Sequence, residues 1–346
     1  MQHLLHRLSL VAAMVVVASA TACATDDSAG TSLDAPLPTE IPPGTSLHAS
    51  LDETKVYLEV TNQKLPFTVS EWAKVTAGPD VTEAFRGDAL DISSNAGIPP
   101  IQAHATGVDT KIVGVKVRSQ PTYQFAAAPG ANVNTVADLR GKRIGFSPGQ
   151  AQGVIVLRTL ADADIPLDQV ELVELESTQF LTALQGKQID VAPMGGTNLA
   201  KYLHQYEAEG AKGIKTEAID ALSILWAPTK TLKDPGKLAT VAELVKHWAR
   251  GEVYAYEHPE EWVQKFYVGN EGLTPEGGKI VLQEQGKPYF PPNWDDAITW
   301  EQETIDLVTR SGWFGEPFPA GELFDRRFEK IASEAVSEEY RAETNA

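Results

Sequence analysis

One stretch in the middle of the chain decides the fold. It reads Val136-Ala137-Asp138-Leu139-Arg140-Gly141-Lys142-Arg143-Ile144-Gly145-Phe146, followed by Ser147-Pro148-Gly149-Gln150-Ala151-Gln152-Gly153. Its pattern predicts a short helix over Thr135–Leu139, a strand over Arg143–Phe146 and a helix over Ala151–Ala161. A polar, glycine-containing loop joins that strand to the second helix. A strand that ends in such a loop and leads into a helix is the building unit of an α/β sheet.

The same unit recurs on both sides of this stretch. Further strands are expected at Ser46–Leu51, Thr68–Val75, Leu90–Ser94, Lys111–Val117, Val170–Leu175 and Ile189–Pro193, and further helices at Pro79–Arg86, Pro99–Thr106, Thr178–Leu184 and Ala200–Glu209. Helices dominate after residue 220, at Val241–Arg250, Pro259–Tyr267, Gly277–Gln285 and Asp295–Ser311. Thr54–Asn62 fits either a strand or a helix, and intrinsic propensity favours the strand. The repeated unit predicts the α/β class with largely parallel sheets.

The N-terminus has the features of a targeting segment. Residues 1–22 combine a basic start at Arg7 with an apolar run that is shorter than the ~20 residues of a membrane-spanning helix. The segment ends at Ala20-Thr21-Ala22-Cys23, which resembles a bacterial lipobox and predicts a lipidated Cys23. The alternative is an ordinary secretory signal in which Cys23 is incidental. Residues 23–44 are rich in Ser, Thr, Asp and Pro and predict a disordered tether that holds an extracytoplasmic body near the cell membrane.

Composition narrows the function. The chain has 346 residues, a formal charge of −18 and one cysteine. The acidic balance argues against a nucleic-acid partner, and a lone cysteine excludes a disulfide framework. The histidines form no close helical pair, so neither a metal site nor a cofactor is predicted. The sequence lacks a nucleophile elbow, a Walker motif and a dinucleotide fingerprint, which favours a protein that is not an enzyme.

Three polar loops follow short strands at equivalent points of the repeated units. They read Ser93-Ser94-Asn95-Ala96-Gly97-Ile98-Pro99, Ser147-Pro148-Gly149-Gln150-Ala151-Gln152-Gly153 and Met194-Gly195-Gly196-Thr197-Asn198. Ligands of open α/β sheets bind beyond the carboxyl ends of the strands. The start of a helix offers unpaired N–H groups that suit an anion. Together the three loops indicate a binding site for a small polar solute.

At these residues the chain resembles a known family. The stretch over 136–146 is similar to the "ADL-x-GK" segment of ABC-importer substrate-binding proteins in the sulfonate, taurine and nitrate branch. Glu83–Ile92 and Ala183–Val191 resemble that family's "A-L-x-x-G-x-x-D" pattern. The resemblance implies a two-lobe periplasmic binding protein-like II fold with a hinge. It divides the chain into 45–125 and 220–330 for the first lobe, 126–219 for the second and 331–346 for a tail. It also implies a helix, rather than a strand, over Glu53–Gln63.

The resemblance also implies a ligand site between the lobes. Carried over by position, the binding candidates are Asp52, Glu53, Asn95, Gly97, Ser147, Gln150, Ala151, Gln152, Gly195, Gly196, Thr197 and Trp226. Two positions depart from the family's pattern. Gly149–Gln152 stands where sulfonate binders commonly have paired hydroxyl residues, and Met194-Gly195-Gly196 stands where many relatives have Trp and Pro. These departures leave the ligand open among a larger sulfonate, an organic acid and a neutral nitrogenous compound.

The implied function is solute capture for an ABC importer. The resemblance predicts a monomeric, lipid-anchored binding protein that takes up a sulfonate or related anion and docks on a permease with its ATPase. One alternative is a binder of nitrate or a pyrimidine-like solute, and another is a ligand sensor without transport. A thiamine-pyrimidine synthase shares the fold, but the secretion signal argues against that intracellular role.

Overall fold

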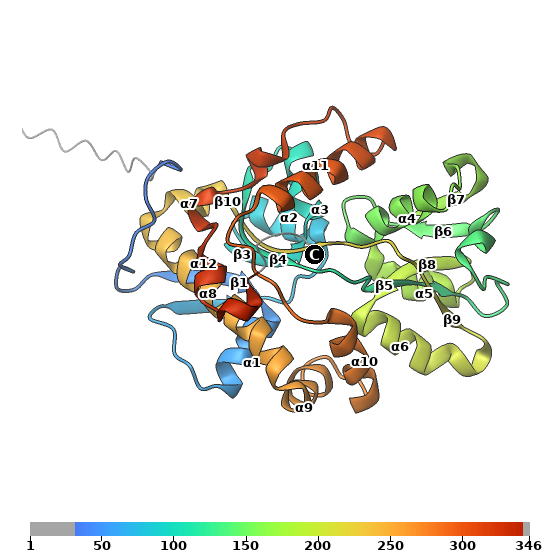
Figure 1. Ribbon diagram of the computed structural model, residues 1–346, viewed down its shortest axis with the longest axis horizontal. Helices are drawn as coiled ribbons and strands as arrows, with labels where there is room; N and C mark the ends of the chain where they lie inside the picture. Colours follow the sequence, from blue (N-terminus) through green and yellow to red (C-terminus); the bar gives the residue numbers. More distant parts are fainter. Residues whose placement is uncertain (1–31, 342–346) are drawn as a thin grey trace, which may run out of the picture. The chain divides into compact units, whose positions relative to one another are not determined.

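The computed structural model describes residues 32–341 and contains two five-stranded sheets (Figure 1). The predicted signal segment at residues 1–22, Cys23 and the first part of the expected tether lie outside the described residues. The first sheet consists of β1 (Ser46–Ser50), β2 (Thr68–Trp72), β3 (Ile92–Ala96), β4 (Thr110–Val117) and β10 (Leu222–Pro228). The second consists of β5 (Tyr123–Ala127), β6 (Arg143–Phe146), β7 (Glu171–Glu174), β8 (Val191–Gly195) and β9 (Lys212–Lys215).

The two sheets share one topology. The strand order is β2-β1-β3-β10-β4 in the first sheet and β7-β6-β8-β5-β9 in the second. Within each sheet, one strand runs against the other four: β10 in the first and β5 in the second. The predicted α/β class with largely parallel sheets is therefore confirmed. The sequence patterns did not predict β5, β9 or β10.

The chain crosses between the sheets twice. It leaves the first sheet after β4 and enters the second at β5, and it returns from β9 to β10. Residues 118–122 and 216–221 form these crossings, so the first lobe is built from two separate parts of the chain. The exact lobe boundaries given by the resemblance stay a prediction.

Helices cover both sheets. They are α1 (Asp52–Val60), α2 (Gly78–Arg86), α3 (Ile98–Ala105), α4 (Ala151–Asp162), α5 (Phe180–Gln185), α6 (Gly196–Tyr206), α7 (Thr229–Lys233), α8 (Pro235–Glu257), α9 (Pro259–Trp262), α10 (Pro275–Gln285), α11 (Asp295–Arg310) and α12 (Ile331–Glu334). A π-helical stretch, η5 (Val263–Val268), continues α9. The part of the chain that follows β10 contacts both lobes, since α10 packs on α6 and α11 packs on α4.

Local sequence explains where the long helices begin. The carboxylate of Asp234 accepts hydrogen bonds from the N–H groups of Gly236 and Lys237 at 2.9 and 3.0 Å, and Pro235 occupies the first helical position of α8. Helix α10 starts in the same way, with the Thr274 hydroxyl as the cap. At Asp52–Val60 the helix implied by the resemblance is confirmed and the strand favoured by propensity is wrong, because Val56, Tyr57 and Leu58 pack against helices of the same lobe.

The aspartate that ends the "A-L-x-x-G-x-x-D" pattern has the same role in both sheets. Asp91 accepts a hydrogen bond from the backbone N–H of His48 at 3.0 Å. Asp190 accepts one from the N–H of Arg143 at 2.9 Å and pairs with the same residue's guanidinium. Each carboxylate thus ties the start of a central strand to its neighbour, which explains why this pattern precedes a strand in each lobe.

The ends of the described chain are attached to the first lobe. Leu33 and Leu37, within the expected tether, pack against the hydrophobic core, and the Arg327 guanidinium donates to the carbonyl of Ala35 at 3.1 Å. Near the other end, Tyr340 is buried and its hydroxyl donates to Glu257. Across residues 32–341 we find no helix long and apolar enough to span a bilayer.

Candidate functional site

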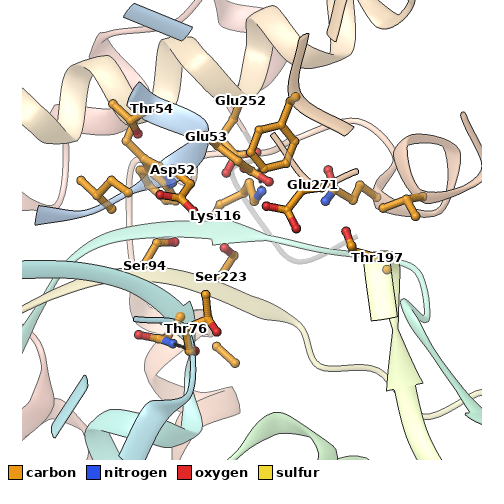
Figure 2. A pocket seen from close by; sticks show the side chains of 18 of the residues that line it. Asp52, Glu53, Thr54, Thr76, Ser94, Lys116, Thr197, Ser223, Glu252 and Glu271 are labelled. Atoms are coloured by element: carbon orange, nitrogen blue, oxygen red, sulfur yellow. Dashed lines mark hydrogen bonds and ion pairs between the residues drawn. The ribbon is translucent and has the colours of Figure 1, made fainter. Parts of the chain in front are cut away.

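A cavity of about 390 Å³ opens where strands of the two sheets end (Figure 2). From the first lobe it is lined by residues that follow β1 and β2 and by the last residues of β3 and β4, and from the second by Gly196 and Thr197 after β8. These positions lie at the carboxyl ends of the strands, where ligands of open α/β sheets bind. The volume falls within the range of small-molecule sites.

Two further cavities continue this one toward the second lobe. A cavity of about 180 Å³ shares Asn95 and Tyr123 with the main cavity and adds the start of helix α4, Gln150 to Gln152. Another of about 240 Å³ shares Arg118 and Tyr123 with it and is also lined by Gln152. The three together form one cleft that contacts both lobes.

Carboxylates dominate the first-lobe wall of the main cavity. Figure 2 shows Asp52, Glu53, Glu252 and Glu271 gathered around Lys116, with Thr76, Ser94 and Ser223 on the facing side. The Lys116 ammonium lies 2.6 Å from an Oε of Glu252, and both side chains are nearly buried. Burial raises the pKa of Glu53 to about 8, and the negative charge of Glu252 adds to the rise.

The rim of this wall carries a second group of charges. Burial raises the pKa of Asp52, while the Lys74 ammonium, 3.9 Å from the carboxylate, opposes the rise. Lys74 also lies 3.4 Å from Glu271. Tyr267, in η5, lines the cavity, and its hydroxyl has no hydrogen-bond partner among residues 32–341. Burial raises the pKa of this phenol, which is therefore a neutral group.

The second-lobe wall is uncharged where helix α4 begins. The first turn of α4 reads Ala151-Gln152-Gly153-Val154, so its positive end is not neutralised by its own side chains. Helix α1, at the equivalent point of the first lobe, begins with Asp52 and Glu53. The loop before α4 is held by Gln150, whose Oε1 accepts from the Ser147 hydroxyl and from the Ser177 N–H, the latter at 2.9 Å.

Two glycines permit close contacts beside the cleft. A Cβ at Gly195 would lie 2.5 Å from the carbonyl oxygen of Thr122, where β8 pairs with β5 in the second sheet. Gly149 has a φ of +73°, a conformation that favours glycine, and a Cβ there would overlap the Gln102 side chain of the first lobe. A larger residue at Gly149 would therefore push against the first lobe.

The structure brings most of the predicted site residues to the cleft. Lining residues from the predicted set are Asp52, Glu53, Asn95, Gln150, Ala151, Gln152, Gly195, Gly196 and Thr197. Gly97, Ser147 and Trp226 line none of these three cavities. Trp226 is buried in β10 and donates its indole N–H to Asn95 Oδ1 at 2.8 Å. Ser147 is buried behind the α4 start, and Gly97 lies against the Glu301 carboxylate.

Several lining residues were missed by sequence reasoning. They are Lys116, Arg118, Tyr123, Glu252, Tyr267 and Glu271. Two of them could have been recognised from the sequence pattern. Lys116 interrupts the apolar strand Thr110–Val117, and Glu252 stands on the buried face of α8 together with Trp248 and Ala255. A charged residue at a core position needs a partner, and these two residues are each other's partners.

Within residues 32–341, no group of three or more His, Cys, Asp or Glu side chains is arranged to hold a metal ion. Of the carboxylates that line the main cavity, Glu252 pairs with Lys116.

Solved structures define the class of this architecture. The alkanesulfonate-binding protein SsuA from Xanthomonas axonopodis pv. citri, solved with MOPS bound, has a TM-score of 0.69 at 19% identity over 88% of this chain and all of that one. The fold is therefore that of a periplasmic binding protein. A desulfurization enzyme, DszB, also has this fold, with a TM-score of 0.53 at 15% identity.

Sequence comparison gives the family. A model of the NMT1/THI5-like family matches residues 74–262, more than half of the chain, and the chain belongs to this family. A putative aliphatic sulfonates-binding protein of Escherichia coli is 28% identical over 38% of the chain, and the match spans only 41% of that relative. A protein of the same description from Bacillus subtilis is 21% identical over 77% of the chain and 79% of its own length. The resemblance to substrate-binding proteins of ABC importers is confirmed.

Proposed function

We propose that this protein is the solute-binding subunit of an ABC importer and captures a small polar solute in the cleft between its lobes. One observation carries the proposal: a cleft at the carboxyl ends of two equivalent sheets, lined from both, in a chain that crosses between them twice. Ligand contacts made to both lobes at once would favour a closed form. The closed form would then be recognised by a permease and its ATPase.

The anionic end of the solute is assigned to the start of helix α4. The relatives described as aliphatic sulfonates-binding proteins support a sulfonate. The N–H groups of the first turn of α4, with the amides of Gln152 and Asn198 and the hydroxyl of Thr178, offer neutral donors around the 180 Å³ cavity. Amide and hydroxyl donors bind a sulfonate oxygen without requiring a cation.

The experiment is a solute panel on the chain lacking its signal segment. Thermal shift and calorimetry with propanesulfonate, taurine, nitrate and a pyrimidine are expected to identify at least one solute that stabilises the protein. Stabilisation should grow with solute concentration, because binding to the folded state alone shifts the unfolding equilibrium. No stabilisation by any solute of the panel would contradict solute capture in this cleft.

A nitrogenous solute is the second candidate. The carboxylates of the first-lobe wall favour it, because they repel a simple anion and accept hydrogen bonds from nitrogen. Nitrate and pyrimidine-like solutes were the alternatives raised by the sequence. Of these two, a pyrimidine-like solute with a basic or hydrogen-donating nitrogen suits the carboxylates, whereas the nitrate anion does not.

The cellular setting is proposed from the sequence. Arg7, the apolar run after it and Cys23 support an extracytoplasmic protein anchored to the cell membrane by lipid on Cys23. Replacement of Cys23 by Ser is expected to release the protein from membranes, and unchanged membrane retention would contradict the anchor. A monomer is sufficient for this role. The alternative role, a sensor that presents its closed form to a receptor, fits the same cellular setting.

Binding rather than catalysis is the proposed activity. The family match and the curated relatives support a binding protein, although the DszB neighbours are enzymes. Binding in such a cleft needs hydrogen bonds and lobe closure only. Turnover of a bound sulfonate or pyrimidine, followed by mass spectrometry, would contradict the proposal.

A further inference from the structure

The first-lobe wall holds more negative than positive groups. Four carboxylates line the main cavity, those of Asp52, Glu53, Glu252 and Glu271, against the two cations Lys116 and Arg118. Both cations already have acidic partners: Lys116 lies 2.6 Å from Glu252, and Arg118 lies 3.4 Å from Asp220. A free anion placed on this wall would therefore meet the carboxylates of Asp52, Glu252 and Glu271 and no cation that lacks an acidic partner.

An independent observation points to a ligand at the same wall. Tyr267 is 1% exposed, lines the cavity, and its hydroxyl has no hydrogen-bond partner in the described chain. A buried hydroxyl left without a partner destabilises the folded protein. Its electrostatic surroundings include Glu53, Glu252 and Glu271. A ligand group that donates to all of these oxygens would satisfy the hydroxyl and the carboxylates together.

We propose that this wall binds a protonated nitrogen of the solute, an ammonium or amidinium group, with the Glu53 carboxylate and the Tyr267 hydroxyl as principal acceptors. This inference rests on the proposed function and specifies the ligand of the same cleft. It is compatible with a sulfonate at the start of α4, since the two cavities share Thr76, Asn95 and Tyr123. The solute would then carry a basic nitrogen at one end and an anionic or polar group at the other.

Binding of a cation at this wall is coupled to the release of a proton from Glu53. Burial and the charge of Glu252 raise the pKa of Glu53 to about 8, so at neutral pH the empty site keeps Glu53 protonated and hydrogen-bonded to Glu252. A cation seated against Glu53 stabilises its charged form, and the Glu53 proton leaves to solvent. An anion in the same place would instead stabilise the protonated form of Glu53. Its binding would then take up a proton or leave the number of bound protons unchanged.

Every charged neighbour of Glu53 enters this balance. Glu252 of α8 opposes ionisation of Glu53, while Lys116 at the end of β4 and Arg118 after it favour ionisation. Glu271 and Asp52, with Lys74 between them, lie on the rim of the same cavity. The two cations moderate the rise in the pKa of Glu53 but do not abolish it.

The test uses two probes that differ only in a terminal amine, propanesulfonate and 3-aminopropanesulfonate, with propylamine as a third. By calorimetry at pH 7, the aminosulfonate is expected to bind about tenfold more tightly than propanesulfonate. Its affinity is expected to rise about tenfold or more from pH 6 to pH 8, as Glu53 loses its proton. In Glu53→Gln both the amine advantage and this pH dependence should disappear.

A second variant separates ligand contact from folding. Tyr267→Phe removes an unpartnered hydroxyl, so the free protein should unfold at the same or a higher temperature while aminosulfonate affinity falls severalfold. Tyr57→Phe is the matched control, because Tyr57 is also buried but its hydroxyl accepts from Gln63 outside the cavity. That control should leave affinity unchanged.

The outcomes distinguish this inference from the proposed function. Equal binding of both sulfonates, in the wild type and in Glu53→Gln, would overturn the inference and leave solute capture standing. Tighter binding of propanesulfonate than of the aminosulfonate at pH 8 would overturn it in the same way. Failure of all three probes and of the wider panel to bind would overturn both.

Discussion

The two lobes are built alike but present different chemistry to the cleft. Their sheets have equivalent strand orders, and each is tied by an aspartate that accepts from the neighbouring strand, Asp91 in one and Asp190 in the other. The first strand-to-helix junction carries Asp52 and Glu53 in the first lobe, whereas the equivalent junction in the second carries Ala151 and Gln152. The shared framework thus sets where the site lies, and the junction residues set what each wall binds.

Charge explains the energetic difference between the walls. The first-lobe wall depends on a nearly buried ion pair, Lys116 with Glu252, and breaking a buried pair by removing one partner leaves an uncompensated charge. The second-lobe wall depends on neutral hydrogen bonds around Gln150. Changes in the first-lobe wall should therefore cost more stability than changes in the second.

The largest expected effect is that of Lys116→Met. It leaves Glu252 buried without its cation, and we expect a loss of about 3–5 kcal/mol in the free energy of unfolding, measured by urea denaturation. Adding Glu252→Gln should recover a large part of the loss. The control is Lys55→Met, which removes a surface pair with Glu59 and should cost about 0.5 kcal/mol or less. Equal losses in the two single variants would contradict a buried pair.

Next in size is Gln150→Ala. The Gln150 amide joins three residues, accepting from the Ser147 hydroxyl and the Ser177 N–H and donating to Glu176 at 2.9 Å. Its removal leaves the buried Ser147 hydroxyl without its acceptor, so the free energy of unfolding measured in urea should fall by about 1–3 kcal/mol. Unchanged stability would show that this loop does not depend on Gln150, and would weaken the contrast between the lobes.

A smaller effect concerns the stability of the empty protein against pH. Burial raises the pKa of Glu301 to about 8, well above the value of an unfolded glutamate. The folded state therefore binds an extra proton between about pH 4.5 and 8, and stability contributed by this residue is lost as the pH rises through that window. Glu301→Gln should flatten the curve, so that the variant gains stability relative to the wild type as the pH rises from 5 to 8. A steeper curve in the variant would contradict this sign.

The smallest expected effect on folding is that of Gln152→Ala. Gln152 lines two cavities of the cleft and lies one residue inside α4. We expect sulfonate affinity to fall about three- to tenfold by calorimetry, since one neutral hydrogen bond is lost, with the unfolding midpoint unchanged. Asn134→Ala, at the surface of the same lobe, is the control. Unchanged affinity in Gln152→Ala would remove the start of α4 from the site.

Sequence patterns were sufficient for the framework and for the location of the cleft. The alternation of strands and helices predicted the class, and the polar loops at 93–99, 147–153 and 194–198 mark junctions at the cleft. Strand β9, Lys212–Lys215, escaped prediction because so short a strand shows little alternation and depends on pairing with distant residues. Strand β10, Leu222–Pro228, is buried along its whole length, so it too lacks the alternation of a half-buried strand. Propensity also failed at Asp52–Val60, where tertiary packing selects the helix.

The charged wall could not be predicted, because its members come from separate parts of the chain. Lys116 belongs to β4, Glu252 to α8 and Tyr267 to η5, and only the return of the chain to the first lobe brings them together. Conversely, Trp226 and Ser147 resembled ligand contacts in sequence but are buried as supports of Asn95 and Gln150. The position of a residue in a sequence motif does not reveal whether its side chain faces the cavity or the core.

The most direct test of this account counts protons. Titration of the wild-type protein with 3-aminopropanesulfonate at pH 7, in two buffers of different ionisation enthalpy, gives the number of protons exchanged on binding. The account predicts release of about one proton in the wild type, because a cation bound beside Glu53 ionises it, and none in Glu53→Gln. Proton uptake, or no exchange by the wild type, would contradict a first-lobe wall that binds a positively charged nitrogen.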